Sequence, residues 1–208
     1  MKPFLIGIAG PSGAGKSIFC RHFQKRHPNV SRLKFDDFFK DIEDVANIGE
    51  SKDWDDPSSI KWTELLQAVS DLKDGKHAIV PNYSRMDDRM IGEKCVLPAP
   101  IMLVDGFMTL INEELRGLLD LTVFFDLSDE SQITRRRERQ PWVTDHYLYN
   151  VMIPKAQENI MPSKQHADIV INAEPSIAEV HESCFTAIES ALITNGKLEL
   201  STPYKITV

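Results

Sequence analysis

Cysteine is scarce in this sequence, and basic residues are outnumbered by acidic ones. The 208 residues include three scattered cysteines, Cys20, Cys95 and Cys184, with no Cys-x-x-Cys spacing. This odd, dispersed set argues against a disulfide framework or a zinc site and predicts reduced, mostly buried thiols in a cytoplasmic protein. Lysine and arginine number 24 against 31 aspartates and glutamates, which gives a net charge of −7. We therefore expect a protein that binds neither nucleic acid nor an anionic membrane.

The sequence also lacks long apolar runs, internal repeats and low-complexity segments. Its first apolar stretch, residues 4–9, leads directly into glycines, is too short to span a membrane and lacks the layout of a signal peptide. Hydrophobic residues make up 42% and charged residues 26% of the chain, the mixture of a soluble globular protein. The length fits one compact domain, which we place at residues 1–208.

Apolar runs of strand length alternate with segments of helical periodicity. The runs predict strands at 4–9, 30–35, 77–83, 101–104, 121–126 and 167–173. The periodic segments predict helices at 16–26, from Pro57 to Asp74-Gly75, and at 112–119, 129–139, 146–160 and 175–194. The acidic, non-periodic segment 40–56 is typical of a surface loop. This alternation predicts an α/β fold with a parallel sheet of about five strands covered by helices on both faces.

A phosphate-binding loop is the strongest motif in the chain. Residues 10–17, Gly-Pro-Ser-Gly-Ala-Gly-Lys-Ser, satisfy the G-x-x-x-x-G-K-[ST] pattern between a predicted strand and a predicted helix. Glycines let backbone N–H groups surround phosphate oxygens, and the helix start adds its positive end. Lys16 supplies a cation for the β- and γ-phosphates and the Ser17 hydroxyl a ligand for Mg²⁺, so ATP and Mg²⁺ are the expected cofactors. The nucleotide contacts expected here are Gly10, Ser12, Gly13, Ala14, Gly15, Lys16, Ser17 and Ile18.

Such a loop serves GTPases, motor ATPases and small-molecule kinases, so other residues must discriminate between them. The sequence has no Asn-Lys-x-Asp guanine-reading motif and is too short for the further domains of most ATPase machines. A kinase needs carboxylates near Mg²⁺ and near the acceptor hydroxyl. Two predicted strands end in such residues, Asp36-Asp37 and Asp105, and the carboxyl ends of parallel strands meet at one edge of the sheet. Asp126 also follows a strand, so a role as a turn or cap aspartate stays open for each of them.

A cluster of arginines lies on the predicted helix 129–139. Its members are Arg135, Arg136, Arg137 and Arg139. Residues 128–130 (Ser-Asp-Glu) are typical of a capped helix start, and Arg135 and Arg139 share one helix face at i and i+4. A helical lid at about 128–146 would bring these cations over the nucleotide phosphates, and the alternative is a solvated basic face.

With these motifs the chain resembles the uridine kinase and nicotinamide riboside kinase family, within the phosphoribulokinase/uridine kinase group of P-loop kinases. Residues 4–17 are similar to the family's opening strand and loop, and Asp36-Asp-Phe-Phe-Lys40 resembles the D-D-F-F-K segment of riboside kinases. Further similar segments are Trp54-Asp-Asp-Pro57 (F-D-H-P), Pro81-Asn-Tyr83 (the start of P-x-Y-D-F), Val104-Asp-Gly-Phe107 (E-G-[IF]), the R-R-x-x-R of Arg135 to Arg139, and residues 162–171 (P-[TS]-K-x-x-A-D-[IV]-[IV]-I). Together they cover most of residues 4–171.

The resemblance implies a P-loop NTPase fold with a small helical lid, and it implies roles for individual residues. Asp36 would be the general base, and Ser17, Asp36 and Asp105 would surround Mg²⁺ directly or through water. The catalytic set implied is Asp36, Lys16, Arg135 and Arg139, with Arg136 also on the nucleotide phosphates. The substrate contacts implied are Asp36, Phe39, Asp55, Tyr83 and Arg135.

The sequence departs from the family in the segments that would bind the phosphoryl acceptor. Asp105 stands where the family usually has Glu, Ser84-Arg85 replaces Asp-Phe, and Asp88 lies about where uridine kinases place a base-reading His. The segment 140–145 lacks the E-R-G-R-D run of uridine kinases.

The expected activity is transfer of the ATP γ-phosphoryl group to the 5′-hydroxyl of a ribonucleoside, with uridine or cytidine favoured. A nicotinamide riboside kinase (favoured by residues 36–40) and a sugar or vitamin kinase (favoured by residues 84–89) are the alternatives within the same chemistry. An ATP-binding regulator without an acceptor site is the non-enzyme alternative, against which Asp36 and the arginine cluster argue. The expected partner is a small nucleoside-like substrate, and a homo-oligomer would be in keeping with the family.

Overall fold

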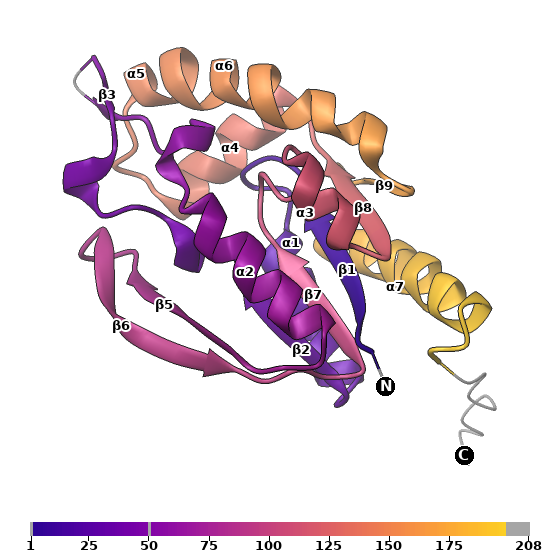
Figure 1. The fold of residues 1–208 in the computed structure, drawn as a ribbon. Coiled ribbons are helices and arrows are strands. Elements are labelled where there is room, and N and C mark those ends of the chain that lie inside the picture. The colour runs from indigo at the N-terminus through magenta and orange to yellow at the C-terminus, as the bar shows by residue number, and fades with distance from the viewer. Residues whose placement is uncertain (1, 50, 199–208) are drawn as a thin grey trace.

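The computed structural model describes residues 2–49 and 51–198 and has a five-stranded parallel sheet at its centre (Figure 1). The strand order is β2 (Val30–Lys34), β7 (Ile101–Asp105), β1 (Phe4–Ala9), β8 (Leu121–Asp126), β9 (Ile169–Asn172). Ile6 in the central strand pairs with Leu103 of β7 and with Leu121 of β8. The α/β class and the five parallel strands are confirmed. The 1–208 extent of the domain stays a prediction, and its residues 1, 50 and 199–208 lie outside the described part.

Helices cover both faces of this sheet. Helices α1 (Lys16–Arg26) and α7 (Ile177–Thr194) pack on one face, and α2 (Trp62–Lys73) and α3 (Glu113–Leu118) on the other (Figure 1). Every residue of β1 is buried: Leu5 belongs to the core on the α2 side, whereas Ile6 and Ile8 belong to the core on the α1 side. This burial on both faces explains why the strand is a continuous apolar run.

The chain between β8 and β9 is almost entirely helical. Helix α4 (Asp129–Arg139) has the predicted bounds, and Ser128 caps it by accepting a hydrogen bond from the Ser131 amide. A second helical stretch follows as α5 (Asp145–Tyr147), η4 (Leu148–Met152), α6 (Ile153–Lys155), η5 (Ala156–Ile160) and η6 (Met161–His166). Its η4 and η5 turns are π-helical, and the buried Ala156 and Ile160 join the core on the α2 side. In the described part of the chain, no helix is long and apolar enough to cross a membrane.

The strand expected at 77–83 lies outside the central sheet. It forms β5 (Ala78–Ser84), which pairs antiparallel with β6 (Arg89–Val96) in a hairpin that packs against α2 (Figure 1). The sequence does not predict β6, because most of its residues are exposed and it lacks the alternation of apolar and polar residues. Sequence-based assignment of 77–83 to a parallel sheet is therefore wrong.

The helix expected to begin at Pro57 begins instead at Trp62. Pro57–Ser59 form only a 3₁₀ turn, η3, in which the Asp56 side chain accepts a hydrogen bond from the Ser58 amide. Ile60 is then extended and bridges to Phe39, which ends the turn before α2 starts. The segment 40–56 is mostly loop, as expected, but contains the short pair β3 (Asn47–Ile48) and β4 (Ser51–Lys52). Two further 3₁₀ turns, η1 (Phe35–Phe38) and η2 (Ile42–Asp44), follow β2.

Candidate active site

The phosphate-loop sequence folds into a turn between β1 and α1. Gly10, Gly13 and Gly15 all have positive φ angles of 131°, 83° and 87°, which L side chains rarely adopt. Gly15 is the N-cap of α1, and no side chain caps this helix start. Its first backbone N–H groups are therefore suited to bind an anion at the positive end of the helix.

Lys16 and Ser17 point from this turn toward the carboxyl end of β7. The Lys16 side chain is buried and donates from Nζ to the Pro11 carbonyl oxygen at 2.8 Å. Burial lowers the pKa of Lys16 to about 8, against the opposing attraction of Asp105 and Asp36. Ser17 Oγ donates to Asp105 Oδ2 at 3.0 Å. The motif lysine and serine thus share one environment with Asp105, at the end of β7, and Asp36, in the turn η1 that follows β2.

Asp105 is held firmly at the end of β7. It is buried and forms an ion pair with Arg32 of the neighbouring strand β2, a residue that no sequence motif marks. Its second oxygen, Oδ1, is buried and has no hydrogen-bond partner among the described residues. A buried carboxylate with one unused oxygen beside a serine hydroxyl fits a hard cation such as Mg²⁺.

The described residues contain no cluster of three or more His, Cys, Asp or Glu side chains suited to a metal ion. Mg²⁺ in kinases keeps water and phosphate oxygens as ligands, so two protein ligands such as Ser17 and Asp105 could hold it. Asp36, the third ligand implied by the resemblance, forms an ion pair with Arg85, with 2.9 Å between Oδ2 and Nη2, and its place at the metal stays a prediction. Asp126, the other acid at a strand end, pairs with Lys164.

Three of the four clustered arginines lie against the phosphate loop. Arg136 and Arg139 both donate to Ser12 Oγ, at 3.2 and 3.1 Å, and Arg135 donates to the Gly13 carbonyl oxygen at 3.3 Å. The approach of α4 is close, since a Cβ at Gly13 would lie 3.2 Å from the Arg135 Cβ. Arg137 points elsewhere and pairs with Asp145.

The burial of Arg139, together with the nearby cations Arg136 and Arg85, lowers its pKa. A cluster of cations held together in this way is suited to bind an anion. Arg135, Arg136 and Arg139 lie beside the phosphate loop, and their role as a lid over the phosphates stays a prediction.

Arg85, the ion-pair partner of Asp36, lies against a cluster of aromatic side chains. Phe39, Trp54, Tyr83 and Phe107 have ring centroids 5.5–6.4 Å apart, and Phe39 is almost fully buried. Arg85 lies over the Phe39 ring, with 4.5 Å from the guanidinium carbon to the centroid. Tyr83 Oη is buried and finds no hydrogen-bond partner in the described part of the chain, and burial raises the pKa of its phenol. The Tyr83 hydroxyl is therefore suited to form a hydrogen bond with a ligand at the edge of this aromatic cluster.

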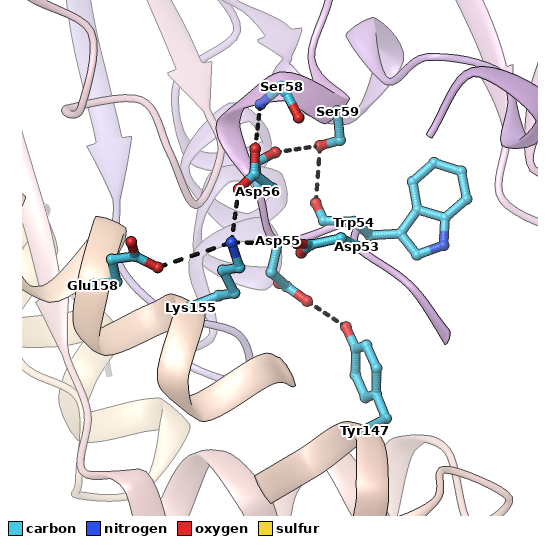
Figure 2. A network of polar contacts seen from close by, with 9 residues as sticks. All are labelled: Asp53, Trp54, Asp55, Asp56, Ser58, Ser59, Tyr147, Lys155 and Glu158. Atoms are coloured by element: carbon cyan, nitrogen blue, oxygen red, sulfur yellow. Dashed lines mark hydrogen bonds and ion pairs between the residues drawn. The ribbon is translucent and has the colours of Figure 1, made fainter. Parts of the chain in front are cut away.

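Asp55 is part of a network that joins the turn 53–56 to the helical stretch 145–166 (Figure 2). Tyr147 Oη donates to Asp55 Oδ2 at 2.5 Å. Lys155 Nζ lies 2.7 Å from Asp56 Oδ2 and 3.2 Å from Asp53 Oδ2. Burial raises the pKa of Asp55, whereas the Lys155 hydrogen bond lowers the pKa of Asp56 to about 2. Sequence reasoning missed Tyr147 and Lys155, because no motif marks them and their partners lie about a hundred residues earlier.

Comparisons with known proteins identify the family of this chain. Residues 5–178 match the phosphoribulokinase/uridine kinase family. The chain is 31% identical over 183 residues to the uridine kinase of Deinococcus deserti, a match that covers 82% of this chain and 88% of that one. It is 28% identical over 182 residues to uridine-cytidine kinase A of Dictyostelium discoideum, which covers 81% of this chain but only 36% of that longer protein.

Among solved structures, phosphoribulokinase from Rhodobacter spheroides has the same fold. The TM-score is 0.63 at 12% identity, and the match covers 82% of this chain and 70% of that one. At this identity the likeness concerns the fold alone. The family match over residues 5–178, together with the Deinococcus relative, shows that the chain belongs to the phosphoribulokinase/uridine kinase family.

Proposed function

We propose that this protein transfers the γ-phosphoryl group of ATP to the 5′-hydroxyl of a ribonucleoside, with uridine or cytidine as acceptor. As a member of its family it is a phosphotransferase that acts on a hydroxyl group and uses ATP. The observation that carries the proposal is the convergence of the phosphate loop, three lid arginines and the exposed carboxylate of Asp36 at one edge of the sheet. The names of the relatives support a pyrimidine nucleoside as acceptor.

The donor half of the site is suited to a triphosphate. The uncapped start of α1 and the loop amides would bind the β- and γ-phosphates, and Lys16 would add a positive charge beside them. Arg135, Arg136 and Arg139 would stabilise the charge that develops on the transferred group. Ser17 and Asp105 would hold Mg²⁺, and the bound ion would neutralise part of the phosphate charge.

Asp36 is the residue we assign to the acceptor hydroxyl. Its side chain is 47% exposed, whereas that of Asp105 is 2% exposed, so Asp36 is the carboxylate that an incoming substrate can reach. It would accept the hydroxyl proton as the oxygen attacks phosphorus in line with the leaving ADP. Asp55 and Tyr83 would contact the ribose and the base.

Arg85 bears on the choice of acceptor. Its guanidinium lies over Phe39 and pairs with Asp36, so a positive charge stands beside the aromatic cluster. This charge disfavours the cationic ring of nicotinamide riboside relative to a neutral pyrimidine. We therefore expect uridine and cytidine to be better acceptors than nicotinamide riboside.

The test is ADP release from ATP·Mg²⁺ with a panel of acceptors: uridine, cytidine, adenosine, nicotinamide riboside, pantothenate and several sugars. We expect acceptor-dependent turnover with a pyrimidine nucleoside, and the Lys16→Ala variant should lose both turnover and ATP affinity. Turnover with a sugar or vitamin alone would replace the nucleoside by that acceptor. ATP binding without ADP release for every acceptor would contradict the kinase proposal and favour a regulatory role.

A further inference from the structure

Tyr147 contacts residues from both halves of the site. Its hydroxyl donates to Asp55 Oδ2, the one hydrogen bond of this carboxylate within the described residues (Figure 2). Its ring lies under Arg136, with 5.5 Å from the guanidinium carbon to the ring centroid. Arg136 in turn donates to Ser12 of the phosphate loop. A continuous series of contacts thus runs from the phosphate loop through Arg136 and Tyr147 to Asp55.

The protonation states suit this arrangement. Burial and the neighbouring Asp55 raise the pKa of the Tyr147 phenol, so its hydroxyl stays protonated and donates. Burial raises the pKa of Asp55, but the Tyr147 hydrogen bond and the charge of Arg136 oppose this effect and favour the ionised form. An ionised carboxylate is an acceptor only, which is the form that receives hydrogen bonds from a pair of sugar hydroxyls.

The backbone around Asp55 is anchored separately. Lys155 binds Asp53 and Asp56 on either side of it and lies in the same helical stretch as Tyr147 (Figure 2). Thr144 Oγ1 accepts the Tyr147 amide hydrogen at 3.2 Å and so fixes the start of α5. With the turn anchored by Lys155, the Tyr147 hydroxyl acts on the orientation of the Asp55 carboxylate and not on the course of the chain.

We propose that Tyr147 is a positioning residue that orients Asp55 for the sugar hydroxyls of the acceptor and couples acceptor binding to the phosphate-binding arginine Arg136. This inference rests on the proposed function, because it takes Asp55 to lie in the acceptor site. Phosphate binding would fix the position of Arg136, and the Tyr147 ring stacked on it would then keep the Tyr147 hydroxyl on Asp55. An acceptor bound to Asp55 would favour the same arrangement. The coupling is reciprocal: each ligand raises the affinity for the other by the same factor.

Two variants separate the hydroxyl from the ring. Tyr147→Phe removes only the hydrogen bond to Asp55, and we expect acceptor KM to rise about tenfold or more while kcat and the KM for ATP change little. Tyr147→Leu also removes the ring under Arg136. In the unchanged protein a non-hydrolysable ATP analogue should tighten nucleoside binding in calorimetric titrations, whereas in Tyr147→Leu the nucleoside Kd should be the same with and without the analogue.

Tyr149→Phe is the matched control. Tyr149 lies in the same helical stretch under Arg137, but it is half exposed and outside the site, so its loss of a hydroxyl should leave KM and the coupling unchanged. Thermal unfolding with the ATP analogue checks that each variant is folded. If Tyr147→Leu does not fold, the double variant Tyr147→Phe/Asp55→Asn tests the interaction between Tyr147 and Asp55 instead. Losses in kcat/KM that add up from the two single variants would overturn this interaction, and non-additive losses would support it.

The outcomes distinguish this inference from the proposed function. An acceptor KM for Tyr147→Phe equal to that of the unchanged protein would overturn the positioning role while leaving the kinase activity intact. Coupling that persists in Tyr147→Leu would overturn the link to Arg136. If the unchanged protein phosphorylates no nucleoside, the proposed function itself fails, and the assignment of Tyr147 fails with it.

Discussion

Asp36 and Asp105 differ in their surroundings, although each follows a strand of the same sheet. Asp105 is enclosed by Arg32 and Ser17, whereas Asp36 is half exposed and forms its one ion pair within residues 2–49 and 51–198 with the exposed Arg85. A buried, paired carboxylate is suited to hold a cation in place, and an exposed one can meet a substrate that enters from solvent. These environments support the proposed division of roles, in which Asp105 would lie at the metal and Asp36 at the acceptor hydroxyl.

For Asp36→Asn we expect a fall in kcat of about a hundredfold or more, because the amide cannot accept the hydroxyl proton. ATP affinity should stay near that of the unchanged protein, since the phosphate-binding groups are untouched. The Arg85 pair is exposed, so its loss should change the thermal midpoint little. Steady-state kinetics and ATP titration measure both quantities. Asp44→Asn, an exposed acid eight residues later, is the control, and a kcat for Asp36→Asn as high as for Asp44→Asn would remove Asp36 as the base.

At the scale of secondary-structure elements, the stretch 145–166 joins the lid to the acceptor side. Its residue Lys155 forms ion pairs with Asp53 and Asp56 and is mostly buried, whereas Lys164, at the other end of the stretch, makes a more exposed pair with Asp126. Two lysines in one helical stretch thus differ in burial and in the number of acidic partners. Their contributions to stability should differ accordingly.

Lys155→Met should destabilise the protein by about 3 kcal/mol, because it leaves the buried Asp53 carboxylate without a compensating charge. For a chain of this length such a loss corresponds to a fall of roughly 6–12 °C in the thermal midpoint. Lys164→Met, the control, should cost under about 1 kcal/mol, since its ion pair is exposed to solvent. Urea unfolding monitored by fluorescence gives both values. Equal losses in the two variants would mean that the Lys155 pair does not anchor the turn 53–56.

Across the whole molecule, local patterns predict the parts of the fold that depend on sequence neighbours. Continuous apolar runs predict the strands of the parallel sheet, and the phosphate-loop motif and the capped helix α4 lie within a few residues of their predicted positions. The hairpin partner β6 escapes prediction because its residues are mostly exposed and carry no periodic pattern.

The site is predictable only in part, for a related physical reason. Asp36, Asp105 and the arginines meet because parallel strands share one edge, which the pattern of elements implies. The side chains that hold these residues are Arg32, Arg85, Tyr147 and Lys155. Each contacts a partner about 50 to 100 residues away, so only the tertiary structure brings the pair together.

The two helices on the α1 face of the sheet meet through a pair of histidines. His22 of α1 and His181 of α7 lie with their Nδ1 atoms 3.1 Å apart. His181 is buried between Phe19 and Phe185, and its Nε2 has no partner within residues 2–49 and 51–198. Burial, and then the neighbouring His22, lowers the pKa of His181 in the folded protein. The neutral form is therefore favoured in the folded state, and the stability it provides is present above the unfolded pKa of about 6.5 and is lost as the pH falls below it.

We expect the free energy of unfolding to fall between pH 7.5 and pH 5, with one proton contributing at most about 1.4 kcal/mol per pH unit. In His181→Phe this fall should be smaller, because a phenyl ring fills the same apolar site without taking up a proton. The nearby ion pair of His27 and Glu189 is present in both proteins and so does not affect the comparison. Urea unfolding at several pH values measures the difference, and His77→Gln, at an exposed position, is the control. If the free energy of unfolding depends on pH in His181→Phe as it does in the unchanged protein, then protonation of His181 does not contribute to this pH dependence.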